Sequence, residues 1–332
     1  MLVSGSPDRA GPAGDSTAWA KVRRLCTFVV VLEVQQLSRS FRTAQGVVRA
    51  LEEATFTVPD GVIAGLLGPN GSGKTTLMRL VMRILPMEKG EILFDGRPIG
   101  DLDRRSIGYM PEERGLYPKA TIYEQLRYLL RLKGFSAEVT QREIQTWGEK
   151  LGILSYIHRP AKTLSKGMQQ KAQLTLALAG NPRFLLLDEP FSGLDPINAQ
   201  EVEQLLRSLK GPGRLILLST HRLEQVDELC DYIMLIHRGR ILLTGHTAKL
   251  KRQYWDQRYF IETEAPVASL RWPEGASWQA ISSHSAEVVL SRALSSQGLL
   301  QGILTQTAVR VFYEKLPTVK EIFLRAVQSH NV

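Results

Sequence analysis

The chain has 332 residues, of which 43% are hydrophobic and 23% charged, with a net charge of +9 at pH 7. No stretch approaches the roughly 18 continuous apolar residues of a membrane-spanning helix, and the length predicts two domains. The two cysteines, Cys26 and Cys230, lie far apart without CxxC or Cys/His companions, which argues against a disulfide framework or a zinc site and suits a reducing cytosol. The positive charge is spread along the chain, so on its own it indicates neither nucleic acid nor anionic lipid as a partner.

The first residues lack the pattern of a folded segment. They are rich in Gly, Pro, Ser, Ala and Asp without a period, and we expect residues 1–30 to form a disordered extension. Basic residues before an apolar run superficially resemble a signal peptide, but Glu33 follows and no small-residue cleavage site appears, so a first strand over residues 29–34 explains the run better. A further hypothesis is that translation begins at a valine near Val31; a peptide from the first 20 residues in cells would exclude it.

Residues 32–58 alternate short apolar runs with polar turns, which predicts an antiparallel subsheet. Phe41 lies in this stretch. An aromatic side chain ahead of a phosphate loop can stack on adenine, although most aromatic side chains in strands are part of a core.

A glycine-rich loop follows the apolar run 62–67, and it reads Gly68-Pro69-Asn70-Gly71-Ser72-Gly73-Lys74-Thr75-Thr76. Its glycines can take positive φ and carry no Cβ, so successive N–H groups can turn toward one anion at a helix N-terminus. Lys74 then reaches the β- and γ-phosphates, Thr75 offers a hydroxyl to Mg²⁺, and Thr76 is placed for another phosphate oxygen. The loop predicts a nucleotide site, and the less favoured alternative is a glycine-rich turn before an ordinary helix.

The pattern changes after the loop. Residues 90–94 and 104–110 are expected to be strands. Apolar residues at helical spacing then predict helices over 121–132 and 139–151, which interrupt the α/β pattern. We therefore predict a helical insertion at about residues 112–162.

Two carboxylates follow an apolar strand. Ser165 is a natural N-cap for a long helix, and the all-apolar run 184–187 comes next and ends in Asp188 and Glu189. Buried carboxylates need a cation or several donors, and Mg²⁺ supplies the cation. The pattern predicts a buried parallel strand that delivers both acids at its carboxyl end.

A helix at 199–209 and another buried strand at 214–218 come next, and this strand ends just before His221. Taken alone, this histidine is more typical of a surface residue at a strand end. Strands that alternate with helices predict a mostly parallel sheet.

The last stretch carries no catalytic constellation. Strands are expected at 259–263, 287–290 and 309–314, and helices at 296–304 and from residue 318. We predict a small C-terminal α+β domain over residues 255–332, with a packing or regulatory role.

Four motifs in a fixed order resemble those of ATP-binding-cassette (ABC) ATPases over about residues 31–245. They are the loop 68–76, then Leu164-Ser165-Lys166-Gly167-Met168-Gln169-Gln170 ahead of Leu185-Leu186-Leu187-Asp188-Glu189-Pro190, then Ser192-Gly193-Leu194-Asp195, and finally His221. The resemblance implies an α/β fold, in which a RecA-like P-loop NTPase core carries an antiparallel β-subsheet and an α-helical subdomain. It also implies ATP and Mg²⁺ as cofactors.

The resemblance assigns roles that phosphoryl-transfer chemistry supports. Lys74 and the loop amides hold the β- and γ-phosphates, while Thr75 and Asp188 hold Mg²⁺. Glu189 polarises the attacking water, and His221 contacts the γ-phosphate and orients that water.

Further residues gain a role from the resemblance alone. Phe41 falls where the family places an adenine-stacking aromatic residue. Ser165 and Gly167 belong to the signature motif, which faces the phosphate loop of the opposite subunit, and Asp195 lies at the same interface. This implies a homodimer that closes over two ATP molecules.

The chain departs from the family pattern in two motifs. Lys166 and Met168 replace two positions of the usual Leu-Ser-Gly-Gly-Gln signature. Glu112 stands where the family generally has a glutamine that contacts Mg²⁺ and water; a carboxylate can still ligate Mg²⁺, and Glu113 is the alternative if the register slips. The stretch 111–117 resembles that of a bacterial exporter subgroup related to sodium- and drug-efflux ATPases.

We therefore expect the ATP-hydrolysing subunit of a bacterial ABC exporter, peripheral at the cytoplasmic face of the membrane and bound to a separate polytopic permease. One alternative is a soluble ABC ATPase that acts on ribosomes or nucleic acid, but such proteins usually carry two cassettes, and no nucleic-acid partner is expected here. The other alternative, an importer ATPase, is disfavoured by the stretch 111–117 and the short C-terminal domain. The permease binds the transported molecule, so this sequence does not predict it.

Overall fold

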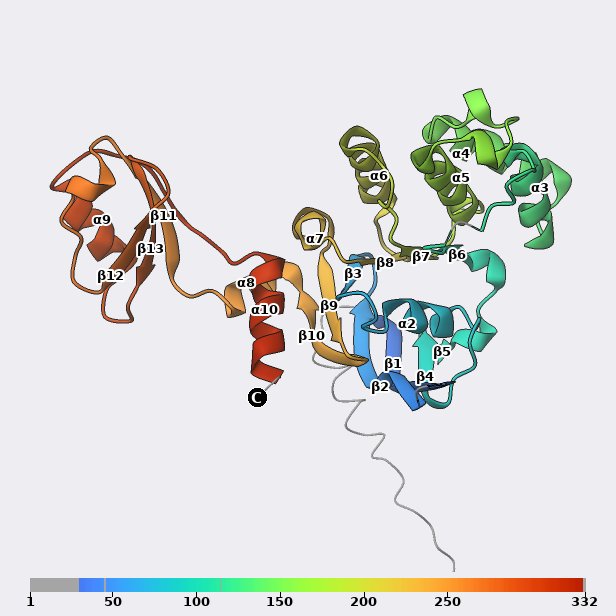
Figure 1. Ribbon diagram of the computed structural model, residues 1–332, viewed down its shortest axis with the longest axis horizontal. Helices are drawn as coiled ribbons and strands as arrows, with labels where there is room; N and C mark the ends of the chain where they lie inside the picture. The colour runs from blue at the N-terminus through green and yellow to red at the C-terminus, as the bar shows by residue number, and fades with distance from the viewer. Residues whose placement is uncertain (1–29, 45, 114, 331–332) are drawn as a thin grey trace, which may run out of the picture.

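The computed structural model of the chain describes residues 30–44, 46–113 and 115–330 (Figure 1). Apart from Val30, which begins the first strand, the predicted disordered extension over residues 1–30 lies outside the described residues, as do the residues that the alternative start would remove. Among the described residues, no helix combines the length and the apolar character that crossing a membrane requires.

The elements follow one another along the chain in the order that Figure 1 shows. The strands are β1 (Val30–Thr43), β2 (Gly46–Pro59), β3 (Ile63–Leu67), β4 (Lys89–Phe94), β5 (Arg97–Pro98), β6 (Ile107–Met110), β7 (Phe184–Asp188), β8 (Leu215–Thr220), β9 (Tyr232–His237), β10 (Arg240–His246), β11 (Arg258–Thr263), β12 (Ala276–Ala280), β13 (Ser285–Leu290) and β14 (Val309–Glu314). The α-helices are α2 (Lys74–Val81), α3 (Ile122–Leu132), α4 (Ala137–Lys150), α5 (Lys166–Leu178), α6 (Pro196–Leu209), α7 (Leu223–Leu229), α8 (Thr247–Gln253), α9 (Ser296–Leu304) and α10 (Val319–His330).

The central sheet has the strand order β10-β9-β3-β8-β7-β6. All its neighbouring strands are parallel except β10, which pairs with β9 in the antiparallel direction. Every residue of β3, β7 and β8 is buried, as expected for parallel strands covered on both faces. The prediction of a mostly parallel sheet is confirmed, and its carboxyl ends gather the residues of the site.

The expected antiparallel subsheet is present, with the order β2-β1-β4-β5. Its first two strands are longer than the short apolar runs suggested, because the polar residues between those runs are taken up by irregularities in the register, for example between Val34 and Leu37. This sheet and α2 share a buried core with one face of the central sheet.

Helices α3, α4 and α5 share a second core with the opposite face of the central sheet. Side-chain caps mark their starts, and the predicted cap of Ser165 on α5 is confirmed. The strand expected at 104–110 is shorter, because the Asp103 carboxylate accepts a hydrogen bond from the backbone of Arg105 at 2.9 Å and caps a 3₁₀ turn over Arg104–Ser106.

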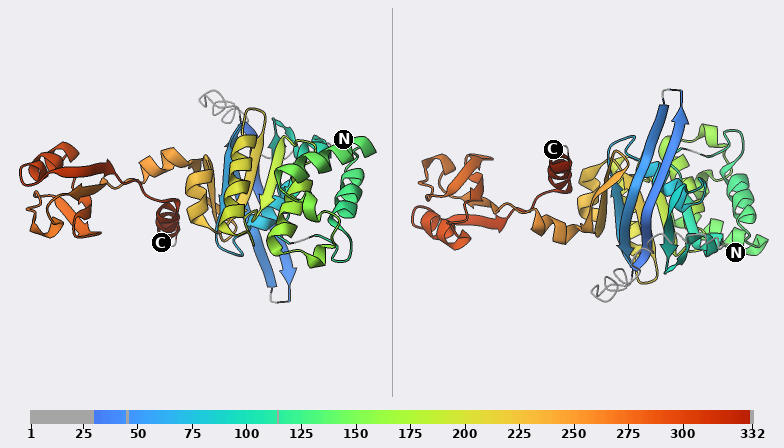
Figure 2. Two further views of the ribbon diagram at one scale, coloured as in Figure 1. Left: turned by 90° about the horizontal axis from the view of Figure 1, so that it is seen from above. Right: turned by 90° about the horizontal axis from the view of Figure 1, so that it is seen from below.

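The C-terminal sheet has the order β12-β13-β11-β14 and shares a third core with α9. Strand β12 was not predicted, because this edge strand is mostly exposed and lacks apolar alternation. We expected the last helix to belong to this domain, but α10 lies beside α7 and α8, away from the sheet (Figures 1 and 2). Its buried residues, Val319, Ile322 and Ala326, belong to the core that contains α5 and α7.

Candidate nucleotide-binding site

The glycines of the loop between β3 and α2 meet different steric demands. Gly71 and Gly73 have φ of 77° and 110°, a region that favours glycine. Gly68 does not use a positive φ; instead, a Cβ there would lie 2.3 Å from the carbonyl oxygen of Ile236. Gly73 needs both properties, because its Cβ would lie 2.4 Å from the carbonyl oxygen of Ala50.

Lys74 is buried at the start of α2, and it points back into the loop. Its ammonium donates to the carbonyl oxygens of Gly68 at 2.9 Å and Pro69 at 3.2 Å. Burial lowers the pKa of Lys74, while the nearby carboxylates of Glu189 and Asp188 act in the opposite direction. A phosphate group could replace the two carbonyl oxygens as the partner of this charge.

The other residues of the loop differ in their exposure to solvent. Asn70 and Gly71 are exposed, and Thr76 is half-buried in the first turn of α2. The hydroxyl of Ser72 is buried and has no hydrogen-bond partner among the described residues. Nor does any described side chain cap the first turn of α2, so its free N–H groups can meet an anion.

Asp188 ends β7, and its side chain is fully buried beside Thr75. Ser219 of β8 donates its hydroxyl to Oδ1, whereas Oδ2 has no hydrogen-bond partner among the described residues. Burial raises the pKa of Asp188, and the neighbouring hydroxyls of Ser219 and Thr75 oppose this rise. An unpartnered buried carboxylate oxygen beside a hydroxyl fits a Mg²⁺ ion.

Protein side chains alone would not enclose such an ion. The described part of the chain holds no group of three or more His, Cys, Asp or Glu side chains arranged to bind a metal. Mg²⁺ usually keeps several waters and binds through one or two carboxylates and the phosphates of its nucleotide. A site in which Thr75 and Asp188 are the protein ligands is consistent with this preference of Mg²⁺.

Glu189 and His221 form a hydrogen-bonded pair at the ends of β7 and β8. Glu189 has φ of 51°, a conformation that non-glycine residues rarely adopt and that occurs often at active sites. Its Oε1 accepts from the backbone N–H of His221 at 3.0 Å and lies 2.7 Å from Nδ1 of the same residue. The carboxylate is 8% exposed and the imidazole 50%, so the acid is fixed while the ring remains accessible.

Sequence reasoning gave no role to two buried polar residues that lie at the centre of the site. Gln170 of α5 donates its side-chain N–H groups to the carbonyl oxygens of Glu189 and Pro190, both at 3.1 Å. Ser219 binds Asp188 and also accepts from the backbone N–H of Glu189 at 3.3 Å. The available signal for Ser219 was a polar residue directly after four apolar strand residues.

Glu112 and Glu113 follow β6, the strand beside β7, and both are exposed. The charge of Glu112 reaches Lys74, where it opposes the lowering of the pKa that burial causes. Glu113 instead pairs with Arg79 of α2 at 4.0 Å. Of the two candidates, Glu112 is therefore the one whose charge reaches Lys74.

Phe41 lies on β1 opposite Val48 of β2, and the Arg39 guanidinium stacks over its ring at 5.0 Å. Further along β2, Ala50 makes the close approach to Gly73 described above. The strand pair that carries Phe41 therefore borders the phosphate loop.

Ser165, Gly167 and Asp195 form a second group. The Ser165 hydroxyl and the Asp195 carboxylate cap α5 and α6 at 3.2 Å and 3.0 Å, and a Cβ on Gly167 would lie 3.3 Å from the carbonyl oxygen of Gly193. Helices α5 and α2 pack on opposite faces of the central sheet (Figure 1). No hydrogen bond or ion pair between described residues joins this group to the loop 68–76.

Comparisons with known proteins identify both parts of the chain. The family model described as ABC transporter matches residues 51–192, and the model described as ATP-binding protein DrrA1-3-like, C-terminal domain, matches residues 245–327. YhaQ of Bacillus subtilis, an uncharacterized ABC transporter ATP-binding protein, is 34% identical over 297 residues, which cover 90% of this chain and 98% of YhaQ. The lantibiotic transport ATP-binding protein SrtF of Streptococcus pyogenes is 34% identical over 213 residues, which cover 64% of this chain and 90% of SrtF.

A solved structure shows the same fold. It is the dimeric post-hydrolysis state of the ATP-binding cassette MJ0796 bound to ADP and Pi, with a TM-score of 0.60, 23% identity, and coverage of 65% of this chain and 98% of that one. The predicted α/β cassette fold is confirmed, and the match to YhaQ extends over nearly the whole relative. The chain therefore belongs to the family of ABC transporter ATP-binding proteins and is an ABC ATPase.

Proposed function

We propose that two copies of this chain hydrolyse ATP at two equivalent sites and drive an exporter through a separate membrane permease. The observation that carries the dimer is the position of Ser165, Gly167 and Asp195, which no hydrogen bond or ion pair between described residues joins to the phosphate loop of their own chain. A two-fold axis would bring each of these groups against the loop of the other copy. The dimeric MJ0796 structure with ADP and Pi supports this arrangement.

In the proposed site, Lys74 and the loop N–H groups bind the β- and γ-phosphates, and Thr75 and Asp188 would hold Mg²⁺. The ion, when bound, neutralises charge on the phosphate oxygens. Glu189 accepts a hydrogen bond from the attacking water and orients it, and His221 directs its Nε2 toward the γ-phosphate. Phosphoryl transfer needs little covalent help, so positioning and charge account for most of the rate.

Mixed dimers test whether the two groups meet across subunits. Lys74→Ala disables the phosphate loop and Ser165→Arg disables the signature group, so each variant alone is expected to be inactive. A mixture is expected to regain about a quarter of the wild-type ATPase rate, because half of the dimers then contain one intact site. The rate is measured at a fixed total concentration while the ratio of the variants is changed.

The control is a mixture in which one copy carries both substitutions and the other is wild type. The intact loop then meets only a disabled signature group, so mixed dimers are expected to contribute no activity. If the first mixture stays inactive, each site is built within one chain and the dimer proposal is wrong.

Two findings support export as the direction of transport. The C-terminal domain matches the DrrA1-3-like family over residues 245–327, and SrtF is named for lantibiotic transport. The stretch 111–117 also has the form typical of efflux ATPases. In this proposal the chain lies at the cytoplasmic face of the membrane and the permease binds the transported molecule.

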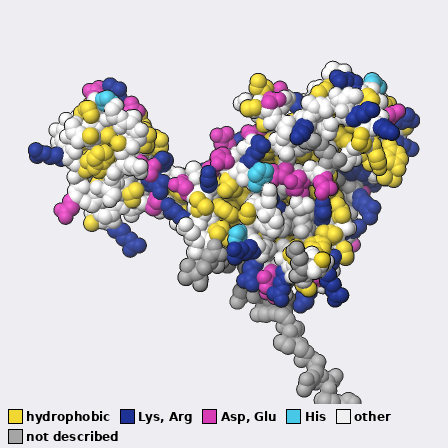
Figure 3. All heavy atoms as spheres, viewed as in Figure 1, with side chains coloured by type: hydrophobic (Ala, Val, Ile, Leu, Met, Phe, Trp, Pro, Cys, Tyr) yellow, Lys and Arg dark blue, Asp and Glu magenta, His cyan; other side chains and the backbone are white. Residues whose placement is uncertain are grey.

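A groove at the β6 edge of the central sheet suits a helix of the permease. It has a volume of about 460 Å³ and lies between the end of α2, the residues before and within β6, and α3. Leu129 and Leu132 line it together with the basic residues Arg83, Arg104 and Lys133. On the face shown in Figure 3, hydrophobic side chains gather over α3 beside Lys and Arg side chains.

The lining indicates the chemistry of the bound helix. Residues 112–117 are not among those that line this groove. Burial lowers the pKa of Lys133 to about 8, so a carboxylate on the permease helix would stabilise its charged form. We infer an amphipathic helix with an acidic residue as the occupant.

Affinity purification from membranes tests the transport assignment and the groove together. With ATP present, the Glu189→Gln protein is expected to bring a polytopic membrane protein with it. Adding Leu132→Asp, at a side chain that is 70% exposed in the groove, is expected to lower this recovery about tenfold, since it puts a charge into an apolar contact. Recovered proteins are identified by mass spectrometry.

Tyr128→Asp is the matched control, because Tyr128 lies on the same helix, is 59% exposed and does not line the groove. It is expected to leave recovery unchanged. Equal losses in both variants would show that the groove is not the docking surface. Recovery of ribosomal or nucleic-acid components alone would overturn the transport assignment and leave the ATPase assignment intact.

A further inference from the structure

The last helix of the chain packs against the helix that follows His221. Helix α7 begins two residues after this histidine. Both helices contribute to one buried core through Val226 and Leu229 of α7 and Val319, Ile322 and Ala326 of α10. Figures 1 and 2 show α10 beside α7 and separated from the C-terminal sheet that precedes it in the sequence.

Asp227 of α7 makes polar contacts with both α8 and α10. Its Oδ1 accepts from the backbone N–H of Val319 at 3.0 Å and lies 2.9 Å from Nζ of Lys251. Because Val319 is the first residue of α10, this carboxylate satisfies one of the free N–H groups at the helix start and interacts favourably with the helix dipole. Asp227 therefore fixes the position of α7 relative to both neighbouring helices.

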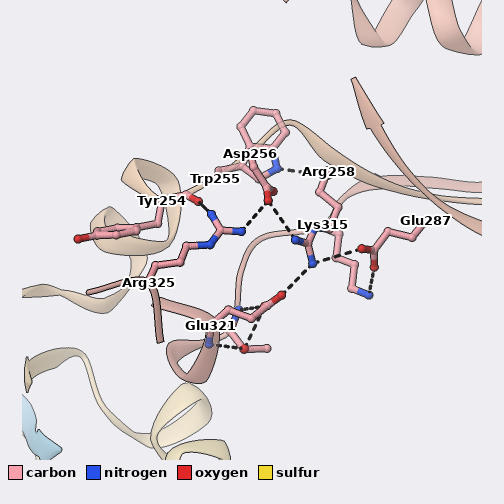
Figure 4. Close-up of polar contacts among 9 residues, drawn as sticks. Tyr254, Trp255, Asp256, Arg258, Glu287, Lys315, Glu321 and Arg325 are labelled. Carbon is pink, nitrogen blue, oxygen red and sulfur yellow. Dashed lines mark hydrogen bonds and ion pairs between the residues drawn. The ribbon is translucent and has the colours of Figure 1, made fainter. Parts of the chain in front are cut away.

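Arg258, the first residue of β11, joins the C-terminal sheet to α10 (Figure 4). Its guanidinium lies 2.8 Å from Glu321 of α10, 3.2 Å from Glu287 of β13 and 3.0 Å from Asp256. Asp256 in turn pairs with Arg325 of α10 at 2.6 Å. The Arg258 side chain is only 19% exposed, so solvent and salt screen this network less than a surface ion pair.

We propose that α10 positions α7, and through it His221, for ATP hydrolysis, and that Arg258 makes this position depend on the orientation of the C-terminal sheet. Asp227 is then a positioning residue, and the C-terminal domain is a regulator of the hydrolysis step. The inference rests on the role proposed for His221. A partner that rotates the sheet would move Glu321 and Arg325 on α10 and so change the rate of hydrolysis.

Two substitutions test separately the contacts of Asp227 on α7 and the contact between Arg258 and α10. Asp227→Asn keeps an acceptor for the Val319 N–H but removes the charge that pairs with Lys251. Glu321→Gln keeps the capping box with Thr318, because glutamine serves there as well, but removes the charge that meets Arg258. With the full chain, we expect kcat to fall about fivefold in the first variant and about threefold in the second.

The KM for ATP is expected to stay within about twofold of the wild-type value in both variants, because the phosphate loop is unchanged. A substitution that lowered kcat by destabilising the fold would also lower the melting temperature, which is measured in parallel. Glu264→Gln is the matched control: it makes the same chemical change at an exposed ion pair with Arg310 inside the C-terminal domain, at 3.9 Å, and should keep the wild-type kcat.

The proposal is overturned if Asp227→Asn and Glu321→Gln both keep the wild-type kcat, or if Glu264→Gln loses as much activity as they do. If Asp227→Asn fails to fold, Glu321→Gln alone decides between these results. His221→Ala is assayed alongside. A wild-type rate in His221→Ala contradicts the proposed role of the histidine. Inactivity of His221→Ala beside wild-type kcat values in both Asp227→Asn and Glu321→Gln contradicts only the role of α10.

Discussion

Replacing Glu189 by glutamine is expected to lower the ATP hydrolysis rate by about 10²- to 10⁴-fold while ATP binding is retained. The amide cannot take up a proton from the attacking water, but its carbonyl oxygen can still accept from the backbone N–H of His221. The phosphate loop and Lys74 are unchanged, so the nucleotide keeps its contacts. Single-turnover hydrolysis and titration with a fluorescent ATP analogue measure the two effects separately.

Glu113→Gln provides the matched control. Glu113 is a carboxylate close to the end of the neighbouring strand β6, but it is 89% exposed and pairs only at 4.0 Å with Arg79. An exposed pair of this kind contributes little, so the rate is expected to stay within about twofold of the wild-type value. A wild-type rate in Glu189→Gln, or an equal loss in both variants, would contradict the role proposed for Glu189.

The centre of the site could be predicted because its chemistry lies in short contiguous segments. In the loop 68–76, the glycines that turn N–H groups toward an anion and the start of the helix that follows them are adjacent in sequence. Asp188 and Glu189 follow an apolar strand directly, so their place at a sheet edge follows from the local pattern. In these segments, the local backbone conformation places the groups that we expect to bind the nucleotide.

The rest depends on contacts between segments that are distant in sequence. Gln170 and Ser219 act through hydrogen bonds to residues 19 and 31 positions away, respectively, and no local pattern encodes such distances. The apolar face of α10 could be recognised from its spacing, but the spacing does not say which surface covers it. Gly68 is required by the approach of Ile236 from β9, a strand that enters the sheet more than 160 residues later.

Gly73→Ala is expected to weaken ATP binding by at least about 100-fold and to lower the melting temperature. Two costs add at this position. A φ of 110° lies outside the left-handed region that other residues occasionally adopt, and a Cβ would overlap the carbonyl oxygen of Ala50 at 2.4 Å. Relieving the overlap requires the loop to move away from β2, which displaces the N–H groups at the start of α2. Nucleotide titration and thermal unfolding measure the two losses.

Gly71→Ala separates the two costs. Gly71 also has a positive φ, of 77°, but no atom of the described residues lies within 4 Å of the position of its Cβ. Only the conformational strain of about 1–2 kcal/mol remains, so binding is expected to weaken by about thirtyfold or less. Equal losses in both variants would mean that backbone conformation alone sets the loop and that the contact with Ala50 is dispensable. A larger loss in Gly73→Ala would show that its higher φ and the approach of Ala50 on β2 together hold the phosphate loop in its binding conformation.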